Sequence, residues 1–292
     1  MRKHHSLCTL FAAALTACGT APVEPVGPLA KETVVAVTDT NQLIRFNAGQ
    51  PQKLLSAKPL TGLQPGEVVL GMDFRVARGQ LFALGSSGRL YRIDTATATA
   101  SPVGGPLTVA LRGNSFGFDF NPTVDRIRVV SDAGQNLRLH PDTGAVVDAD
   151  PKTEGVQTDA ALAFDAADLH AGKPAAVVAA AYSYNQQDDK LTTNFAIDAR
   201  QGVLLTQGSR EGAQPAVSPN SGRLFTVGPL KAGAFEHASF DISDVRNTAY
   251  AALTASGATA STWVRVDLAT GAATPIGRIA GGKPVVGIAI EP

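Results

Sequence analysis

The chain has little cysteine, few aromatic residues and no excess of charge of either sign. Only 2 cysteines occur among its 292 residues, so a framework of several disulfides is excluded. The 25 basic and 25 acidic side chains cancel, and without a basic surface we do not expect nucleic acid as a partner. What the chain does have is 29 glycines and 18 prolines, which favour many short strands and tight turns over helices.

The first 17 residues have the pattern of an export signal. Arg2 and Lys3 form a basic start, an apolar run too short to span a bilayer follows over 7–15, and 15–18 read Leu-Thr-Ala-Cys. This tetrapeptide resembles the bacterial lipobox, which implies that Cys18 is lipidated and becomes the first residue of the mature chain. The alternative is an ordinary secretory signal with a chance cysteine. A lipidated Cys18 would anchor the protein to a membrane of the cell envelope, at the outer membrane or the cell surface.

The remaining chain divides into a tether and one folded domain. Residues 18–32 contain three prolines and no apolar period, so we expect them to hold the domain away from the membrane. Residues 33–292 are expected to form a single domain. Because Cys8 would be discarded with the signal peptide 1–17, the domain itself has no thiol, which excludes cysteine catalysis and cysteine-based zinc sites.

A short motif recurs along the domain and predicts its fold. It is an apolar stretch around Gly-x-Asp or a close variant, repeated about every 46 residues with one longer interval of about 76. Its five copies lie at 70–74, 116–120, 162–165, 238–242 and 286–290. Further short apolar strands and turns rich in Asp, Thr and Gly follow the first four copies. Four short antiparallel strands in about 46 residues are typical of a β-propeller blade, an all-β fold.

The two ends of the chain predict how the ring of blades closes. Residues 33–69 supply only three strands of a blade, and 286–292 supply one more. We therefore expect the C-terminal strand to pair into the N-terminal blade, which leaves no free sheet edge. This predicts five blades of four strands each. Six blades are the alternative, because 217–225 could begin another blade, but the extra residues are too few for four strands and favour a long hairpin on the fourth blade.

The segment 116–139 resembles a known family. It reads Phe-Gly-Phe-Asp-Phe-Asn-Pro-Thr-Val-Asp-Arg-Ile-Arg-Val-Val-Ser-Asp over 116–132 and Gly-Gln-Asn-Leu-Arg-Leu over 134–139. This run is similar to the signature of the bacterial family called domain of unknown function 4394, and the resemblance extends over about 34–288. The resemblance implies an exported, often lipid-anchored, propeller-like domain. It implies no activity and no catalytic residues.

Four aspartates occupy one position of the recurring motif. They are Asp73, Asp119, Asp165 and Asp241. Because the first strands of propeller blades surround the central axis, we expect these carboxylates to converge there. One hypothesis is a ligand site, either for a hard cation such as calcium or for the acid and base of a glycan hydrolase. We favour the other hypothesis, in which each carboxylate accepts hydrogen bonds that join adjacent blades, because a repeated side chain serves a need of every blade.

The third blade departs from the repeat at three positions. It has Arg126, Arg128 and Asp132 where the second blade has Gln, Phe and Ser. The two arginines lie on the same face of a strand, where two guanidinium groups could bind a carboxylate or phosphate. Pairing with Asp119 or Asp132 inside the protein is the favoured alternative. Four further arginines repeat on the third strands and are expected on a solvated face. They are Arg45, Arg92, Arg138 and Arg265.

No catalytic constellation is recognised in the sequence. Residues 113–117 match the nucleophile-elbow pattern, but a strand follows Ser115 where the elbow needs a helix. The histidines His140, His170 and His237 lie far apart in the chain and have no paired spacing. We therefore expect a binding or scaffolding module for a small molecule or an envelope protein, with no assigned cofactor. The alternative is an extracytoplasmic hydrolase of a glycan, lactone or phosphoester with its site at the axial channel, and the fold alone does not decide between them.

Overall fold

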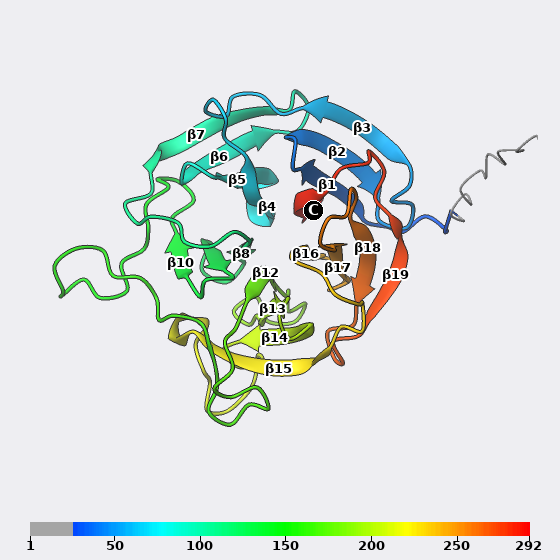
Figure 1. Cartoon of the computed structure of the whole chain (residues 1–292). Helices are drawn as coiled ribbons and strands as arrows, with labels where there is room; N and C mark the ends of the chain where they lie inside the picture. The colour runs from blue at the N-terminus through cyan, green and yellow to red at the C-terminus, as the bar shows by residue number, and fades with distance from the viewer. Residues whose placement is uncertain (1–25) are drawn as a thin grey trace, which may run out of the picture.

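The computed structural model describes residues 26–292, so the predicted signal peptide and Cys18 lie outside the described residues. Strands β1 to β20 form five sheets within this range. Figure 1 shows the sheets arranged as blades around a central axis. The protein is therefore an all-β, five-bladed β-propeller, as the recurring motif predicts.

The first two blades hold four antiparallel strands each. From the axis outward, blade 1 contains β20 (Val285–Ile290), β1 (Thr33–Thr38), β2 (Gln42–Asn47) and β3 (Leu54–Pro59). Blade 2 contains β4 (Val69–Arg75), β5 (Gln80–Gly85), β6 (Arg89–Asp94) and β7 (Thr99–Pro106), with the 3₁₀ turn η1 (Val76–Arg78) between β4 and β5.

The other three blades differ in strand number. Blade 3 contains only β8 (Phe116–Asn121), β9 (Arg126–Ser131) and β10 (Asn136–Leu139). Blade 4 contains β12 (Val177–Tyr182), β13 (Asn194–Asp198), β14 (Val203–Gln207), β15 (Arg223–Pro229) and β11 (Ala163–Phe164), with the 3₁₀ turn η2 (Pro219–Ser221) before β15. Blade 5 contains β16 (His237–Ile242), β17 (Ala249–Thr254), β18 (Thr262–Val266) and β19 (Ala273–Arg278). The prediction of four strands in every blade is thus wrong for blades 3 and 4.

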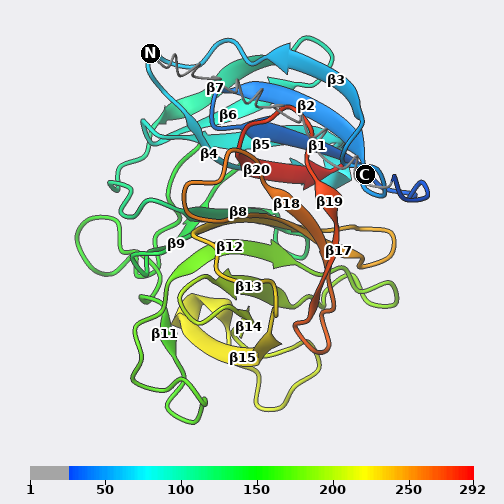
Figure 2. The ribbon, with the colours of Figure 1, turned by 45° about the vertical axis from the view of Figure 1, so that its right-hand side comes forward.

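The C-terminal strand closes the ring. β20 pairs antiparallel with β1, and the register runs from Val34 opposite Ile290 to Val37 opposite Gly287. Figure 2 shows the two strands side by side although they lie at opposite ends of the chain. The predicted closure is confirmed, and with it the count of five blades.

The start of blade 4 was predicted wrongly. The copy of the motif at 162–165 is not an inner strand, because β11 pairs parallel with β15 at the outer edge of the blade. The inner strand of blade 4 is β12, which follows this copy of the motif in the chain, where the repeat predicts the second strand of the blade. Its residues Ala179, Ala180 and Ala181 contain neither the glycine nor the aspartate of the motif, so the repeat is hidden there. The residues around 217–225 form η2 and β15 and belong to this blade.

Each apolar cluster of the core lies between two neighbouring blades. The five clusters join blades 4 and 5, 1 and 2, 5 and 1, 2 and 3, and 3 and 4. In β1, Val34 and Ala36 pack toward blade 5, whereas Val35 and Val37 pack toward blade 2. Inner strands are buried on both faces and therefore read as continuous apolar runs. A polar side chain on such a strand is unusual and requires a partner.

The described part of the predicted tether lies against blade 1. Asn47 holds it with its side chain, which accepts a hydrogen bond from the backbone of Ala30 and donates to the carbonyl oxygens of Ala30 and Glu32. Gln50 donates to the carbonyl oxygen of Gly27. Within 26–292, no helix has the length and apolar character that crossing a membrane requires.

Candidate functional site

Three of the four motif aspartates meet at the axis. Asp73 on β4, Asp119 on β8 and Asp241 on β16 are buried, and one oxygen of each lies within 4.8 Å of the others. The corresponding residues of β12 and β20 are Ala181 and Ala289. We call Asp73, Asp119 and Asp241 the aspartate cluster.

Each carboxylate of the aspartate cluster accepts a hydrogen bond from the next blade. Asp73 accepts from the Phe120 N–H at 2.8 Å, Asp119 from the Tyr182 N–H at 2.9 Å and Asp241 from the Ile290 N–H at 2.6 Å. The three donors follow directly after the motif position of the neighbouring inner strand. The predicted role of these carboxylates as links between blades is therefore seen in the structure.

Two of the aspartates use their second oxygen on their own strand. Asp73 also accepts from the Phe74 N–H at 2.7 Å, and Asp241 from the Ile242 N–H at 2.6 Å. The blade that precedes each of these two has alanine at the motif position, so these N–H groups would otherwise lack an acceptor. Asp119 differs, because the preceding Asp73 already serves Phe120. The aspartate cluster thus supplies acceptors for buried backbone N–H groups of the inner strands.

The three carboxylates have raised pKa values. Burial raises the pKa of all three, and the charges of the neighbouring aspartates raise those of Asp73 and Asp119 further. The pKa of Asp241 rises to about 7, mainly because of burial. In the part of the chain that the structure describes, none of the three forms an ion pair. All three shifts have the same direction, so the cluster does not offer the pair of unlike carboxylates that a glycan hydrolase requires.

Asp165, the fourth predicted member, lies elsewhere. It follows β11 at the outer edge of blade 4 and forms an ion pair with Arg223 on β15. The Ala167 N–H and Arg223 hold its pKa below the ordinary value. The predicted set of four axial carboxylates is therefore wrong for Asp165. The three remaining carboxylates hold six oxygens, but five of these already accept a backbone N–H, whereas calcium takes six to eight oxygen ligands.

The axis is constricted next to the aspartate cluster. Two residues before the motif position the five inner strands have Gly71, Gly117, Ala179, Ser239 and Gly287. These small residues surround a void of only about 10 Å³. A Cβ atom on Gly117 would lie 2.5 Å from the backbone nitrogen of Ala180, so glycine is required for blades 3 and 4 to approach this closely. The constriction separates the aspartate cluster from the end of the axis where the inner strands begin.

A larger cavity lies at that end of the axis, and we call it the mouth cavity. It has a volume of about 360 Å³ and is lined by residues of blades 1, 2, 3 and 5. Val69, Phe116 and Val285 give it apolar walls. Its polar lining consists of Ser115, His237, Asn114 and Thr254 and the acidic residues Asp39 and Glu236. Cavities that bind small molecules have this character, with apolar walls and a few placed polar groups.

Ser115 and His237 meet in the mouth cavity. The Oγ of Ser115 lies 2.5 Å from the Nδ1 of His237. Both residues stand four positions before a motif aspartate, Asp119 or Asp241, so a period of two places each on the same face of the chain as that aspartate. Among the described residues no carboxylate bonds the Nε2 of His237, so the pair is not a complete triad. Sequence reasoning missed this contact because 122 residues separate the two in the chain.

The sequence of the chain also matches a known protein family. The family described as domain of unknown function 4394 matches residues 42–289. The chain belongs to this family. None of the curated proteins matches the chain significantly.

Three solved structures with low sequence identity show a weak structural similarity to this family member. A nidogen/laminin complex structure has 11% identity and a TM-score of 0.48, with 89% of this chain and 98% of the other covered. A putative 6-phosphogluconolactonase from Bacteroides uniformis has 13% identity and a TM-score of 0.40, with 85% and 82% covered. Dihydro-heme d1 dehydrogenase NirN has 13% identity and a TM-score of 0.37, with 89% and 46% covered.

The three unusual residues of blade 3 in this family member do not form one site. Arg126 is the first residue of β9 and Arg128 the third, whereas Asp132 follows its last residue, Ser131. Because a six-residue strand is about 20 Å long, Asp132 lies far from Arg126. Asp132 accepts a hydrogen bond from the Asn114 N–H at 2.9 Å. The predicted pairing of the arginines with Asp119 or Asp132 is not seen. Arg128 instead bonds Asp159, at 2.6 Å between Nη1 and Oδ2.

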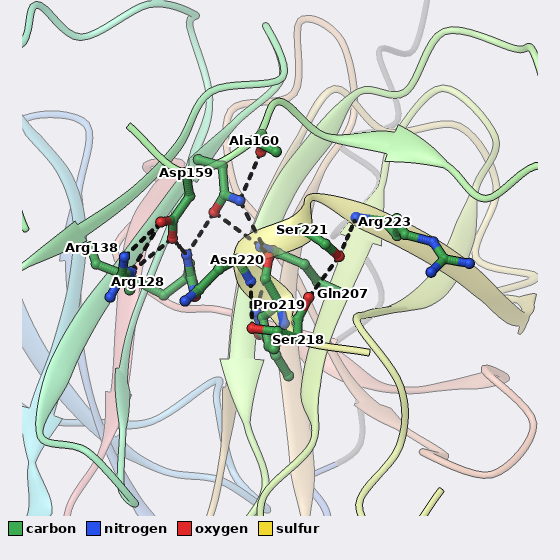
Figure 3. A network of polar contacts seen from close by, with 12 residues as sticks. Arg128, Arg138, Asp159, Ala160, Gln207, Ser218, Pro219, Asn220, Ser221 and Arg223 are labelled. Carbon is green, nitrogen blue, oxygen red and sulfur yellow. Dashed lines mark hydrogen bonds and ion pairs between the residues drawn. The ribbon is translucent and has the colours of Figure 1, made fainter. Parts of the chain in front are cut away.

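Asp159 and Arg138 were not predicted as site residues. Asp159 lies in the loop that replaces the fourth strand of blade 3. Arg138 was grouped with Arg45, Arg92 and Arg265, but it bonds Asp159 through both Nε and Nη2. Figure 3 shows Arg128 and Arg138 on either side of this carboxylate. The sequence did point to this strand, because Arg126 and Arg128 replace the Gln and Phe of the second blade. It gave no indication that Asp159 is the partner of Arg128.

Proposed function

We propose that the protein is a lipid-anchored binding protein of the cell envelope that holds a small ligand in the mouth cavity. The observation that carries the proposal is the cavity of about 360 Å³ at the axis, assembled from four blades around Ser115 and His237. A hollow of this size suits a small molecule rather than a protein segment. The apolar walls would bury the body of the ligand, and the two polar side chains would orient it.

Ligand binding is tested by thermal unfolding of the purified protein in the presence of sugars, small acids and acyl compounds. A ligand at 100 times its dissociation constant contributes about 2.7 kcal/mol, which shifts the unfolding midpoint measurably. Val68 lines the cavity and is 39% exposed, so Val68→Trp is expected to fill it and abolish the shift. The matched control is Val245→Trp, at an exposed valine outside the cavity. A shift that survives Val68→Trp would contradict the proposal.

Anchoring at the envelope is tested on the cysteines of the sequence. If Cys18 is lipidated, Cys18→Ala releases the protein from the membrane fraction and abolishes labelling by a fatty-acid analogue. Cys8→Ala is the matched control, because Cys8 lies within the predicted signal peptide. Membrane association that persists in Cys18→Ala would contradict lipidation of Cys18.

The contact between Ser115 and His237 favours hydrolysis of an ester or lactone as a second candidate function. In such a reaction, Oγ of Ser115 attacks the acyl carbon while His237 accepts its proton, and His237 then protonates the departing alkoxide. Water releases the acyl group by the reverse proton transfers. A fluorophosphonate probe is expected to label Ser115 and to lose this labelling in Ser115→Ala and His237→Gln. Ser261→Ala, at a buried serine bonded to Thr254, is the control. Absence of labelling in the unaltered protein would exclude this candidate.

A further inference from the structure

Three guanidinium groups gather between blades 3 and 4, away from the mouth cavity. Arg128 on β9 lies directly opposite Arg138 on β10, and Arg126 lies two residues from Arg128 on the same face. Together with Asn121, Tyr182 and Asn220 they line a cavity of about 390 Å³, which we call the arginine groove. Asn121 and Tyr182 end the inner strands β8 and β12, so the groove lies toward the end of the axis opposite the mouth cavity.

In the part of the chain that the structure describes, one carboxylate compensates the three arginines. Asp159 bonds both Arg128 and Arg138, and its side chain is 1% exposed. Arg126 donates only to the carbonyl oxygens of Val124 and Asp125, at 3.4 and 2.9 Å, and forms no ion pair with any residue in 26–292. The nearby carboxylate of Asp125 is itself paired with Arg75. The groove therefore carries an excess of two positive charges.

The arginines retain N–H donors that no described residue uses. Arg128 donates to Tyr182, Asn136, Asp159 and Asn220, which occupies four of its five N–H groups. Arg138 uses Nε and Nη2, and Arg126 uses Nη1. The remaining donors belong to side chains that line the same cavity. Unused guanidinium donors around a cavity of this kind suit an oxyanion, which accepts two of them at once.

The walls of the arginine groove are fixed before a ligand arrives. The side chain of Asn136 donates to the carbonyl oxygens of Ala160 and Pro219. Gln207 donates to Asn136 and to the same Pro219 oxygen. Figure 3 shows this network joining β10, β14 and η2 around Arg128. Because the network already orders the guanidinium of Arg128, little side-chain freedom remains to be lost on binding.

We propose that the arginine groove binds a small molecule that carries a carboxylate or phosphate group. The volume exceeds that of a single oxyanion and lies in the range of small-molecule sites. The anionic group bonds the unused donors of Arg126, Arg128 and Arg138, and a neutral polar body fills the rest of the groove against Asn121 and Asn220. This site is separate from the mouth cavity and does not depend on the function proposed for it.

Isothermal titration calorimetry of the unaltered protein tests the site with glucuronate, glucose 1-phosphate and glucose. We expect one or both anions to bind and glucose not to bind, and the stronger of the two anions identifies the preferred group. Arg126→Gln is expected to weaken binding at least tenfold, and Arg126→Lys to weaken it less, because lysine keeps the charge but lacks the two-donor geometry.

Two controls make the test specific. Arg265→Gln removes an exposed arginine of β18 in blade 5 and is expected to leave binding unchanged. Val68→Trp fills the mouth cavity and is also expected to leave it unchanged, which separates this site from the proposed function. The proposal is overturned if neither anion binds, if Arg126→Gln binds as tightly as the unaltered protein, or if Arg265→Gln weakens binding equally.

Discussion

The aspartate cluster and the arginine groove both bring together three like charges, but they use them differently. The three aspartates accept five hydrogen bonds from backbone N–H groups and connect blades 2 to 3, 3 to 4 and 5 to 1. The three arginines share one carboxylate and keep unused donors beside a cavity of about 390 Å³. One set of charges is committed to the fold, and the other has capacity left for a ligand.

Burial explains this difference. The aspartates lie on inner strands, where both faces pack against other blades and every polar group must find a partner inside the protein. Of the arginines, only Arg128 is as deeply buried, and it is also the one with the most internal partners. Arg126 and Arg138 lie nearer the surface and have fewer. Charge clustering alone therefore does not indicate a binding site; the unused hydrogen-bonding capacity does.

The largest effect is expected when the buried arginine is removed. Arg128→Met leaves Asp159 with Arg138 alone, leaves Asn136 with Gln207 as its remaining donor and leaves Asn220 without the donor of its side-chain oxygen, which is expected to lower the free energy of unfolding by about 3 to 5 kcal/mol. Urea denaturation measures this loss. Arg265→Met, at an exposed arginine on β18, is the control and is expected to change stability by less than about 0.5 kcal/mol. A loss below about 1 kcal/mol for Arg128→Met would show that Arg128 is not structurally committed.

The aspartate cluster predicts a pH dependence of stability. The folded protein binds protons on these carboxylates more tightly than the unfolded chain, so their contribution to stability is present at low pH and is lost as pH rises through the raised pKa values. For Asp241, a rise from 3.8 to about 7 corresponds to about 4 kcal/mol at 1.36 kcal/mol per unit. We therefore expect the unfolding free energy of the unaltered protein to fall relative to that of Asp241→Asn as the pH rises from 4 to 8. A difference that is constant over this range would contradict the raised pKa.

A smaller effect is expected from the loss of one acceptor at the closure of the ring. Asp241 accepts from Ile242 with one oxygen and from Ile290 with the other. In Asp241→Asn the new amide nitrogen faces one of these N–H groups, so a buried donor is left unpaired, which is expected to lower stability by about 1 to 3 kcal/mol. Both variants are measured near pH 4, where the folded protein keeps its proton on Asp241 and the cost of burying the charge does not enter. Asp244→Asn is the control, because that partly exposed neighbour does not bond the next blade. Equal losses in the two variants would exclude the role of Asp241 in closure.

The smallest effect on stability is expected at the residue proposed to bind the ligand. Arg126 is half-buried and bonds only two carbonyl oxygens, so Arg126→Gln is expected to change the free energy of unfolding by less than about 0.5 kcal/mol while it weakens anion binding. Urea denaturation and calorimetry on the same sample measure the two quantities. A large loss of stability would assign Arg126 to the fold, like Arg128.

Much of the fold could be predicted from the sequence because the physical need repeats. Gly-x-Asp marks the inner strands of blades 2 and 3, where the glycine allows close packing and the aspartate accepts a hydrogen bond from the next blade. The copy at 162–165 misled because a similar apolar stretch with an aspartate can also form an edge strand. The inner strand of blade 4 was missed because Ala179 and Ala181 stand where the motif has its glycine and its aspartate.

The polar sites were less predictable, because they depend on contacts between distant parts of the chain. Ser115 and His237 belong to blades that are not neighbours in the ring, and Asp159 lies in a loop with no counterpart in the other blades. Arg138 shares its repeat position with three arginines outside the groove. A repeat indicates which residues are equivalent in the blades, whereas a site depends on where one blade differs.

The most direct test of the comparison is the thermal unfolding midpoint of Asp119→Asn at pH 8, with and without calcium. The side-chain oxygen that remains in this variant would still accept the Tyr182 N–H, and the substitution would remove a carboxylate whose charged form is disfavoured by burial and by the two neighbouring aspartates. The account predicts a midpoint equal to or above that of the unaltered protein, with no effect of calcium on either. A midpoint that falls in the variant, together with a calcium-dependent rise in the unaltered protein, would contradict it and make the axial carboxylates a metal site.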